Sequence, residues 1–417
     1  MNDPYHIYMD LDVLNNDYNS ATKPQLRFEE TRNTPFIPGD SADYFCSIVR
    51  FNIQTGNTLP VFIPRILSGQ NDPNLTVYTV TIQDSILDNG TLRYFTGTSI
   101  IRHEPEDLTA PIPPSPMNGQ DLSTNYYYVY NYQHFVNLVN KALAAAYKQC
   151  TDAILAYFGG TQTGDSWWGH DTLKKAVAPY MVFDVDTNRV TLHADTELFD
   201  MTQSHLFGSV VEGTDGSPMK IFMSDRLYEL FSGLPSRRTF ESGNLAYRLN
   251  VVDRYFNKVT QKVTYTPSGS TEPVVVDRTV LMLNQEMTSI ALWNPVASIV
   301  FSTSLLPIIQ TQTTTPKDIG SQSSNLISGG NNSNLLPILS DFSIAVDGGN
   351  QYRPMIEYNP GAEYRLLDMN STANLSRLDI IVYWKDRFGG LHPFQLQPGC
   401  AASVKIMFRR RDFSVPS

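Results

Sequence analysis

Apolar residues occupy every second position along much of the C-terminal part of this chain. Ile380, Val382 and Trp384 follow this pattern, and the segment Val404–Phe408 repeats it after a stretch that contains glycine and proline. A two-residue period with β-branched and aromatic side chains, broken by turn residues, is typical of antiparallel strands. We therefore predict that the chain ends in β-sheet.

Similar alternation occurs on both sides of the middle of the chain, in segments of strand length. These segments are Tyr44–Ile53, Thr76–Ile82, Tyr247–Val252, Lys258–Tyr265, Val274–Leu283, Ile290–Phe301, Ile338–Val346 and Ile356–Tyr358. Many short strands joined by long connections are typical of two packed antiparallel sheets. The predicted fold class is mainly β, a jelly-roll sandwich.

The period changes in the middle of the chain. Apolar residues recur there at three- and four-residue spacings, at Phe135, Leu138, Val139, Ala142 and Ala146. This spacing predicts one amphipathic helix, which ends before a pair of glycines at 159 and 160. A turn at 186–188 then predicts a hairpin over residues 180–193. We interpret this part as an α+β insertion within the β domain.

These patterns suggest a division of the chain into three parts. Residues 1–40 are polar and rich in asparagine and proline, and we expect an extended N-terminal arm. Residues 41–120 and 245–417 are assigned to the jelly-roll β domain, and residues 121–244 to the central α+β insertion. The polar tract 310–334 is expected to be a surface loop.

Composition narrows the classes of function. Only 17% of residues are charged while 41% are hydrophobic, which suits a subunit that neighbours cover. The net charge of −10 argues against strong nucleic-acid binding, with Arg409–Arg411 as a local basic exception. No apolar run of membrane-spanning length and no signal peptide are visible. Cys46, Cys150 and Cys400 are widely separated and are expected to be buried free thiols.

Four carboxylate or histidine pairs are candidates for catalytic or metal sites. His103-Glu104 begins like a zinc motif, but Pro105 blocks the helix that this motif needs. Asp10 and Asp12 lie in the predicted N-terminal arm, and Asp184 and Asp186 lie beside a hairpin turn, where aspartate is a common turn residue. No activated nucleophile accompanies His170-Asp171. We therefore predict that the protein is not an enzyme and has no metal or cofactor.

Six segments in a fixed order carry a resemblance to a known family. They are Ser47–Pro64, Asn131–Leu143, Phe222–Pro235, Trp293–Ile308, Tyr358–Met369 and Val382–Arg410. Together they resemble the minor capsid, or penton-type, proteins of Polinton-like viruses, adintoviruses and virophages. The resemblance implies a virion protein, made in the host cytoplasm or nucleus, with one jelly roll that assembles as a homopentamer at icosahedral vertices beside the major capsid protein.

Two alternatives remain open at this point. One is a major capsid subunit with two jelly rolls, which forms trimers, although a single helix-bearing insertion breaks the expected likeness of two halves. The other is a lectin-like attachment protein that binds a glycan or host receptor through Trp167 and Trp168. For contacts between subunits, the aromatic and arginine candidates are Arg50, Trp293, Tyr383, Trp384 and Arg409.

Overall fold

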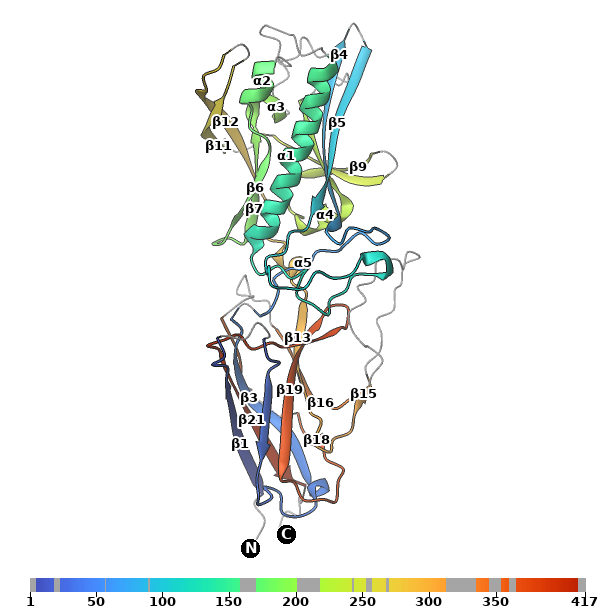
Figure 1. The fold of residues 1–417 in the computed structure, drawn as a ribbon, viewed down its shortest axis with the longest axis vertical. Helices are drawn as coiled ribbons and strands as arrows, with labels where there is room; N and C mark the ends of the chain where they lie inside the picture. Colours follow the sequence, from blue (N-terminus) through green and yellow to red (C-terminus); the bar gives the residue numbers. More distant parts are fainter. Residues whose placement is uncertain are drawn as a thin grey trace.

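The computed structural model consists of two bodies stacked along one long axis, with both termini at the far end of the lower body (Figure 1). The structure describes residues 5–18, 23–56, 58–88, 91–157, 170–200, 218–241, 244–252, 257–267, 270–312, 335–344, 354–359 and 365–411. No helix within these ranges is long and apolar enough to cross a membrane.

The first sheet of the lower body has the order β1-β21-β3-β17, and β18 also pairs with β3. Its strands are β1 (His6–Leu14), β3 (Tyr44–Gln54), β17 (Met355–Tyr358), β18 (Leu367–Asp368) and β21 (Ala401–Arg410). The predicted alternation in the last strand is confirmed, because Val404, Ile406 and Phe408 are buried in the core.

The second sheet of the lower body has the order β16-β13-β19-β2, and β20 also pairs with β19. Its strands are β2 (Arg27–Thr31), β13 (Val296–Ser302), β16 (Ile338–Ser343), β19 (Arg377–Asp386) and β20 (Leu391–Pro393). A short separate pair is formed by β14 (Thr311–Gln312) and β15 (Leu335–Leu336).

The connections between these two sheets identify the fold. In chain order, β1, β3, β17 with β18, and β21 belong to the first sheet, while β2, β13, β16 and β19 belong to the second. All their pairings are antiparallel. Eight strand positions distributed in this way over two facing sheets form a jelly roll, as the sequence predicted.

The described part of residues 1–40 differs from the expected extended arm. The strand β1 pairs with β21 over its whole length, and β2 pairs with β19. Met9 and Leu11 alternate with exposed aspartates, so β1 buries these two side chains in the jelly-roll core. The N-terminal segment therefore completes both sheets of its own chain.

A buried carboxylate connects three parts of the jelly roll. The oxygens of Asp379 in β19 accept hydrogen bonds from the backbone and hydroxyl groups of residues 303–305, just after β13, at 2.6–2.9 Å. Arg27 of β2 donates a further bond at 3.0 Å. Although burial acts to raise it, these hydrogen bonds hold the pKa of Asp379 below its usual value.

The upper body contains two sheets on either side of one long helix (Figure 1). The first sheet has the order β5-β4-β8-β10-β9, and the second has the order β11-β12-β7-β6. Their strands are β4 (Leu75–Asp88), β5 (Thr91–Arg102), β6 (Tyr180–Asp184), β7 (Arg189–Asp195), β8 (Lys220–Ser224), β9 (Ser236–Glu241), β10 (Asn244–Leu249), β11 (Lys258–Tyr265) and β12 (Val274–Asn284).

The predicted amphipathic helix is α1 (Tyr132–Tyr157), and its apolar face packs on β4, β5 and β6. Shorter helices are α2 (His170–Lys175), α3 (Thr196–Phe199), α4 (Asp225–Leu230) and α5 (Ile290–Trp293). The segment Ile290–Phe301, expected to be one strand, divides into α5 and β13 around Pro295. The structure has free thiols at Cys46 and Cys150, both buried, and at Cys400, which is half-buried.

The insertion is larger than the predicted residues 121–244. The strands β4, β5, β11 and β12 belong to the sheets of the upper body, so the insertion occupies the connection between β3 and β13. Alternation identifies a strand but not the sheet it joins, which explains the wrong boundaries. The described residues of the upper body form a helix between two sheets and no second jelly roll, so the double jelly-roll alternative is not favoured.

The two bodies meet at an aromatic cluster centred on Trp293. Its ring centroid lies 5.3 Å from that of Phe62, 5.5 Å from that of Phe135 and 5.3 Å from that of Phe231. The indole nitrogen of Trp293 donates a 2.6 Å hydrogen bond to the carbonyl oxygen of Leu230. The chain therefore enters and leaves the insertion through one packed cluster.

Gly97 of β5 allows α1 to approach the sheet. A Cβ at this position would overlap the carbonyl oxygen of Ala146 and the backbone nitrogen of Cys150 in α1. We expect Gly97→Ala to lower the free energy of unfolding by about 2–3 kcal/mol, because backbone atoms cannot move aside as a flexible side chain can. Urea unfolding would measure this change, and Gly39→Ala is the control, since no atom lies within 4 Å of its Cβ. Equal effects of the two substitutions would contradict the prediction.

A buried carboxylate in β4 predicts a pH-dependent stability of the upper body. Burial raises the pKa of Asp84 to about 7, and no described group donates to its Oδ2 atom. The folded chain then binds this proton more tightly than the unfolded chain does. The stability that the fold gains from a protonated Asp84 is therefore complete below pH 3.8 and is lost as the pH rises through about 7.

We expect Asp84→Asn to stabilise the protein by on the order of 4 kcal/mol at pH 8, with a gain that shrinks towards pH 4. Chemical unfolding of both proteins across this range would measure the difference. The exposed Asp277→Asn on β12 controls for the loss of one carboxylate. A gain from Asp84→Asn that does not change with pH would disprove the assignment.

Candidate functional site

The outer face of the first jelly-roll sheet carries two of the predicted interface residues. Arg50 of β3 and Lys405 of β21 each lie 3.1 Å from a carboxylate oxygen of Asp10 on β1. Burial acts to raise the pKa of Asp10, but the hydrogen bonds from Lys405 and Arg50 hold it below its usual value. All three side chains are solvent-accessible. Their ion pairs therefore hold the charged groups in place on this face but add little stability.

Aromatic rings extend this cluster towards the chain termini. Arg409 of β21 lies over the ring of Tyr5 at 5.8 Å, and Lys405 lies over the ring of Tyr8 at 5.7 Å. Tyr5 is 40% exposed and Tyr8 is 52% exposed. We call this surface the basic–aromatic face, and it comprises Tyr5, Tyr8, Asp10, Arg50, Lys405 and Arg409. Tyrosine and arginine at half-exposed positions are the residues that most often anchor protein interfaces.

The other three predicted interface residues lie elsewhere. Tyr383 is half-buried on β19, opposite Val300 and Pro393 in the second sheet. Trp293 and Trp384 are corrected to core residues, because only 2% and 1% of their surfaces are exposed. An enclosed indole has no area to offer a second subunit. The sequence could not separate these cases, since core and interface favour the same aromatic residues.

Trp384 belongs to a packed group inside the jelly roll. Its ring stacks on His392 at 4.1 Å, and Nε2 of His392 lies 2.8 Å from Oδ2 of Asp386. Oδ1 of Asp386 also accepts backbone hydrogen bonds from Phe388 and Gly390 in the adjoining turn. The carboxylate therefore holds the turn between β19 and β20.

His103 and Glu104 have separate structural partners. The Nε2 atom of the buried His103 donates to the carbonyl oxygen of Tyr126 at 2.9 Å, and burial lowers the pKa of His103 to about 4. Glu104 forms an exposed ion pair with Lys141. The two side chains are therefore not directed at one shared ligand.

The two Asp-x-Asp pairs also have local partners. Asp184 accepts hydrogen bonds from the hydroxyl group of Thr187 and the backbone nitrogen of Asp186, which fixes the β6–β7 turn. These bonds lower the pKa of Asp184. Asp10 belongs to the basic–aromatic face. Within the described ranges, no group of three or more histidine, cysteine or acidic residues is arranged to hold a metal ion.

The predicted glycan candidates Trp167 and Trp168 lie outside the described residues, as do the side chains of His170 and Asp171. Part of the basic tip at Arg409–Arg411 contacts other residues of the same chain. Arg411 pairs with Asp368 at 2.8 Å and lies over the ring of Phe45 at 4.8 Å. This contact joins the end of β21 to β18 and β3 of the same sheet.

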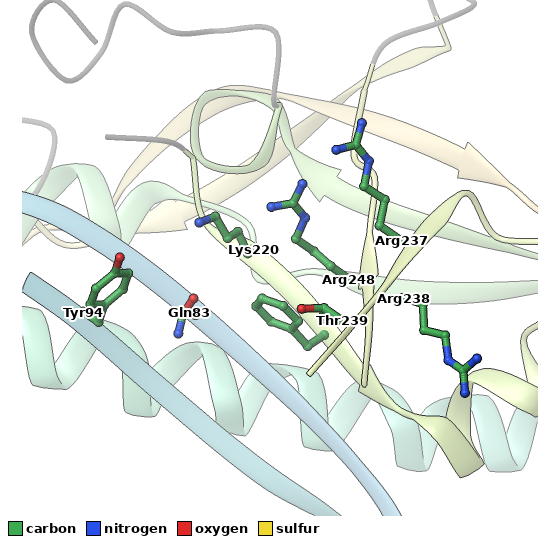
Figure 2. Close-up of a pocket in the computed structure, with 8 residues that line it drawn as sticks. Gln83, Tyr94, Lys220, Arg237, Arg238, Thr239 and Arg248 are labelled. Atoms are coloured by element: carbon green, nitrogen blue, oxygen red, sulfur yellow. The ribbon is translucent and has the colours of Figure 1, made fainter. Parts of the chain in front are cut away.

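A second basic surface, not foreseen from the sequence, forms a hollow of about 520 Å³ on the five-stranded sheet of the upper body (Figure 2). Lys220, Arg237 and Arg248 come from the adjacent strands β8, β9 and β10, and we call this site the basic hollow. Gln83, Tyr94, Phe222, Arg238 and Thr239 complete its lining. Residues this far apart in sequence give no linear motif.

The chain matches relatives in a virophage. It is 31% identical over 152 residues to the uncharacterised protein V18 of the Sputnik virophage, over 35% of this chain and 85% of that relative. It is 22% identical over 237 residues to structural protein V19 of the same virophage, over 56% of this chain and 94% of that relative. Both matches span most of the relative's length.

Solved structures share the complete fold. A chain in the cryo-electron microscopy structure of the Sputnik virophage has a TM-score of 0.71 and 23% identity, over 98% of each chain. The mavirus penton protein has a TM-score of 0.55 and 12% identity, over 97% of this chain and 99% of that chain. The model of the Sputnik minor capsid protein V18/19 family matches residues 7–410. The chain therefore belongs to the Sputnik minor capsid protein V18/19 family.

Proposed function

We propose that five copies of this minor capsid protein close a ring at the icosahedral vertices of a virion, where its role is structural. The family match over residues 7–410 is the observation that carries this proposal. The likeness to the mavirus penton protein over nearly the whole of both chains supports it. A subunit of this kind acts through its surfaces, and the jelly roll supplies two broad sheet faces for contacts with neighbours.

A closed ring requires two different surfaces on each subunit, because head-to-tail contacts pair unlike faces. The basic–aromatic face on the first sheet supplies one such surface, with the exposed Tyr8 and Arg50 near its centre. The second sheet lies on the opposite side of the sandwich and presents the half-buried Tyr383. We propose that these two faces form the contact between neighbouring subunits.

The position of the insertion supports an orientation in the shell. Both termini lie at the end of the jelly roll that is farthest from the upper body (Figure 1). We infer that the jelly roll lies within the shell beside the major capsid protein of the same virion, while the upper body projects outward. This arrangement would leave the upper body accessible to a host receptor or glycan.

The size of the assembly tests the ring. Native mass spectrometry of the full-length chain should give a particle of about 235 kDa, which is five copies of a 46.9 kDa chain. A particle of about 141 kDa would indicate a trimer and would contradict the proposal. A chain that stays monomeric at high concentration would also contradict it.

Two substitutions test the proposed contact face. Tyr8→Ala and Arg50→Ala should each raise the concentration needed for half-assembly about tenfold, because anchor residues of this type contribute more than about 1 kcal/mol. Analytical ultracentrifugation would measure this shift. Arg102→Ala is the control, because Arg102 is also an exposed arginine in an ion pair, with Asp72 of the upper body. Equal weakening by all three variants would argue against the basic–aromatic face.

A further inference from the structure

We propose that the basic hollow of the upper body binds an anionic saccharide, a sugar that carries sulfate or carboxylate groups. Lys220, Arg237 and Arg248 lie on three adjacent strands of a chain whose net charge is −10. No described carboxylate pairs with Arg237 or Arg248. Such a concentration of positive charge in an acidic protein favours an anionic ligand.

The strand register places these charges on one face. Arg248 of β10 is directly opposite Arg237 of β9 on one side and Phe222 of β8 on the other. Lys220 is two residues from Phe222, so it lies on the same face. Figure 2 shows Lys220, Arg237 and Arg248 grouped on this face.

This arrangement has an energetic cost in the absence of an anion. Like charges directly opposite each other on one sheet face destabilise an antiparallel pair by a few tenths of a kcal/mol to about 1 kcal/mol. An anion between Arg237 and Arg248 would replace their repulsion with charge-assisted hydrogen bonds. The cross-strand arginine pair is therefore better explained by a ligand than by the stability of the sheet.

The remaining lining favours a sugar as the carrier of the anionic group. Gln83 and Thr239 place hydrogen-bonding groups beside the cations, and Tyr94 presents an aromatic ring that is 54% exposed. The volume of about 520 Å³ is in the range of small-ligand sites and accommodates one or two sugar rings. Nucleic acid would instead require an extended basic track along its phosphates. An acidic strand would pair with a sheet edge rather than occupy the sheet face.

The inference concerns a single subunit and does not depend on the ring. If the chain failed to form pentamers but bound the saccharide, the proposed assembly alone would be overturned. If pentamers formed without saccharide binding, only the basic hollow would lose its assignment. The two proposals can therefore fail separately.

Isothermal titration calorimetry with the full-length protein tests the site. The probes are a sulfated hexasaccharide derived from heparin, the same hexasaccharide after desulfation, and sialyllactose, which carries a carboxylate. We expect binding of the sulfated or the sialylated probe, and the stronger of the two identifies the anionic group. No binding of either probe would overturn the proposal, as would equal binding of the desulfated hexasaccharide.

The double variant Arg237→Gln with Arg248→Gln should weaken binding at least about tenfold, because it removes two charge-assisted hydrogen bonds. Arg102→Gln is the control, since it removes an exposed arginine from β5 of the same sheet, outside the lining of the hollow. An equal loss in the control would overturn the assignment. So would equally tight binding of a polyglutamate peptide or an oligothymidylate, which would indicate a general polyanion surface.

Thermal unfolding separates loss of binding from loss of folding. Removal of two repelling arginines should leave the melting temperature of the double variant unchanged or raise it, because the unliganded sheet is relieved of like-charge repulsion. A double variant that binds as tightly as the natural chain while remaining folded would disprove the site.

Discussion

The whole architecture depends on the aromatic cluster at which the chain enters and leaves the insertion. Phe62 comes from the segment that leaves β3, and Trp293 comes from the helix that precedes β13. Because these rings are packed together, more than two hundred inserted residues begin and end at nearly one point. The strands β3 and β13 can therefore occupy the same places in the sandwich as they would with a short connection, and the jelly roll tolerates the upper body without distortion.

Loop residues strengthen this junction from the side of the lower body. Leu122 and Tyr126–Tyr128 belong to the connection between β5 and α1, yet their side chains are buried in the jelly-roll core. The ring of Tyr128 lies 5.6 Å from that of Trp384. Part of the insertion thus completes the core of the lower body. The two bodies are therefore joined by shared packing and not by a linker alone.

The sequence predicted what depends on local periodicity. The last strands and α1 followed from two-residue and from three- and four-residue spacings, because each element buries one face. The pairing partners did not follow: alternation in β1 does not reveal that β21, almost four hundred residues away, is its neighbour. The sequence does not predict the basic hollow for the same reason, since Lys220, Arg237 and Arg248 become neighbours only through the sheet order. Trp293 and Trp384 had the residue type of interface anchors but are enclosed in the cores.

The pairing of β1 with β21 also sets the order in which the protein can form during synthesis. The elements of the insertion are all present once residue 295 has been made, and most of their contacts join segments within this stretch. The jelly roll, in contrast, cannot close its first sheet until Ala401–Arg410 leaves the ribosome. The upper body can fold on the nascent chain before β1 and β2 have their pairing partners, so the jelly roll closes only after β19 and β21 have been made.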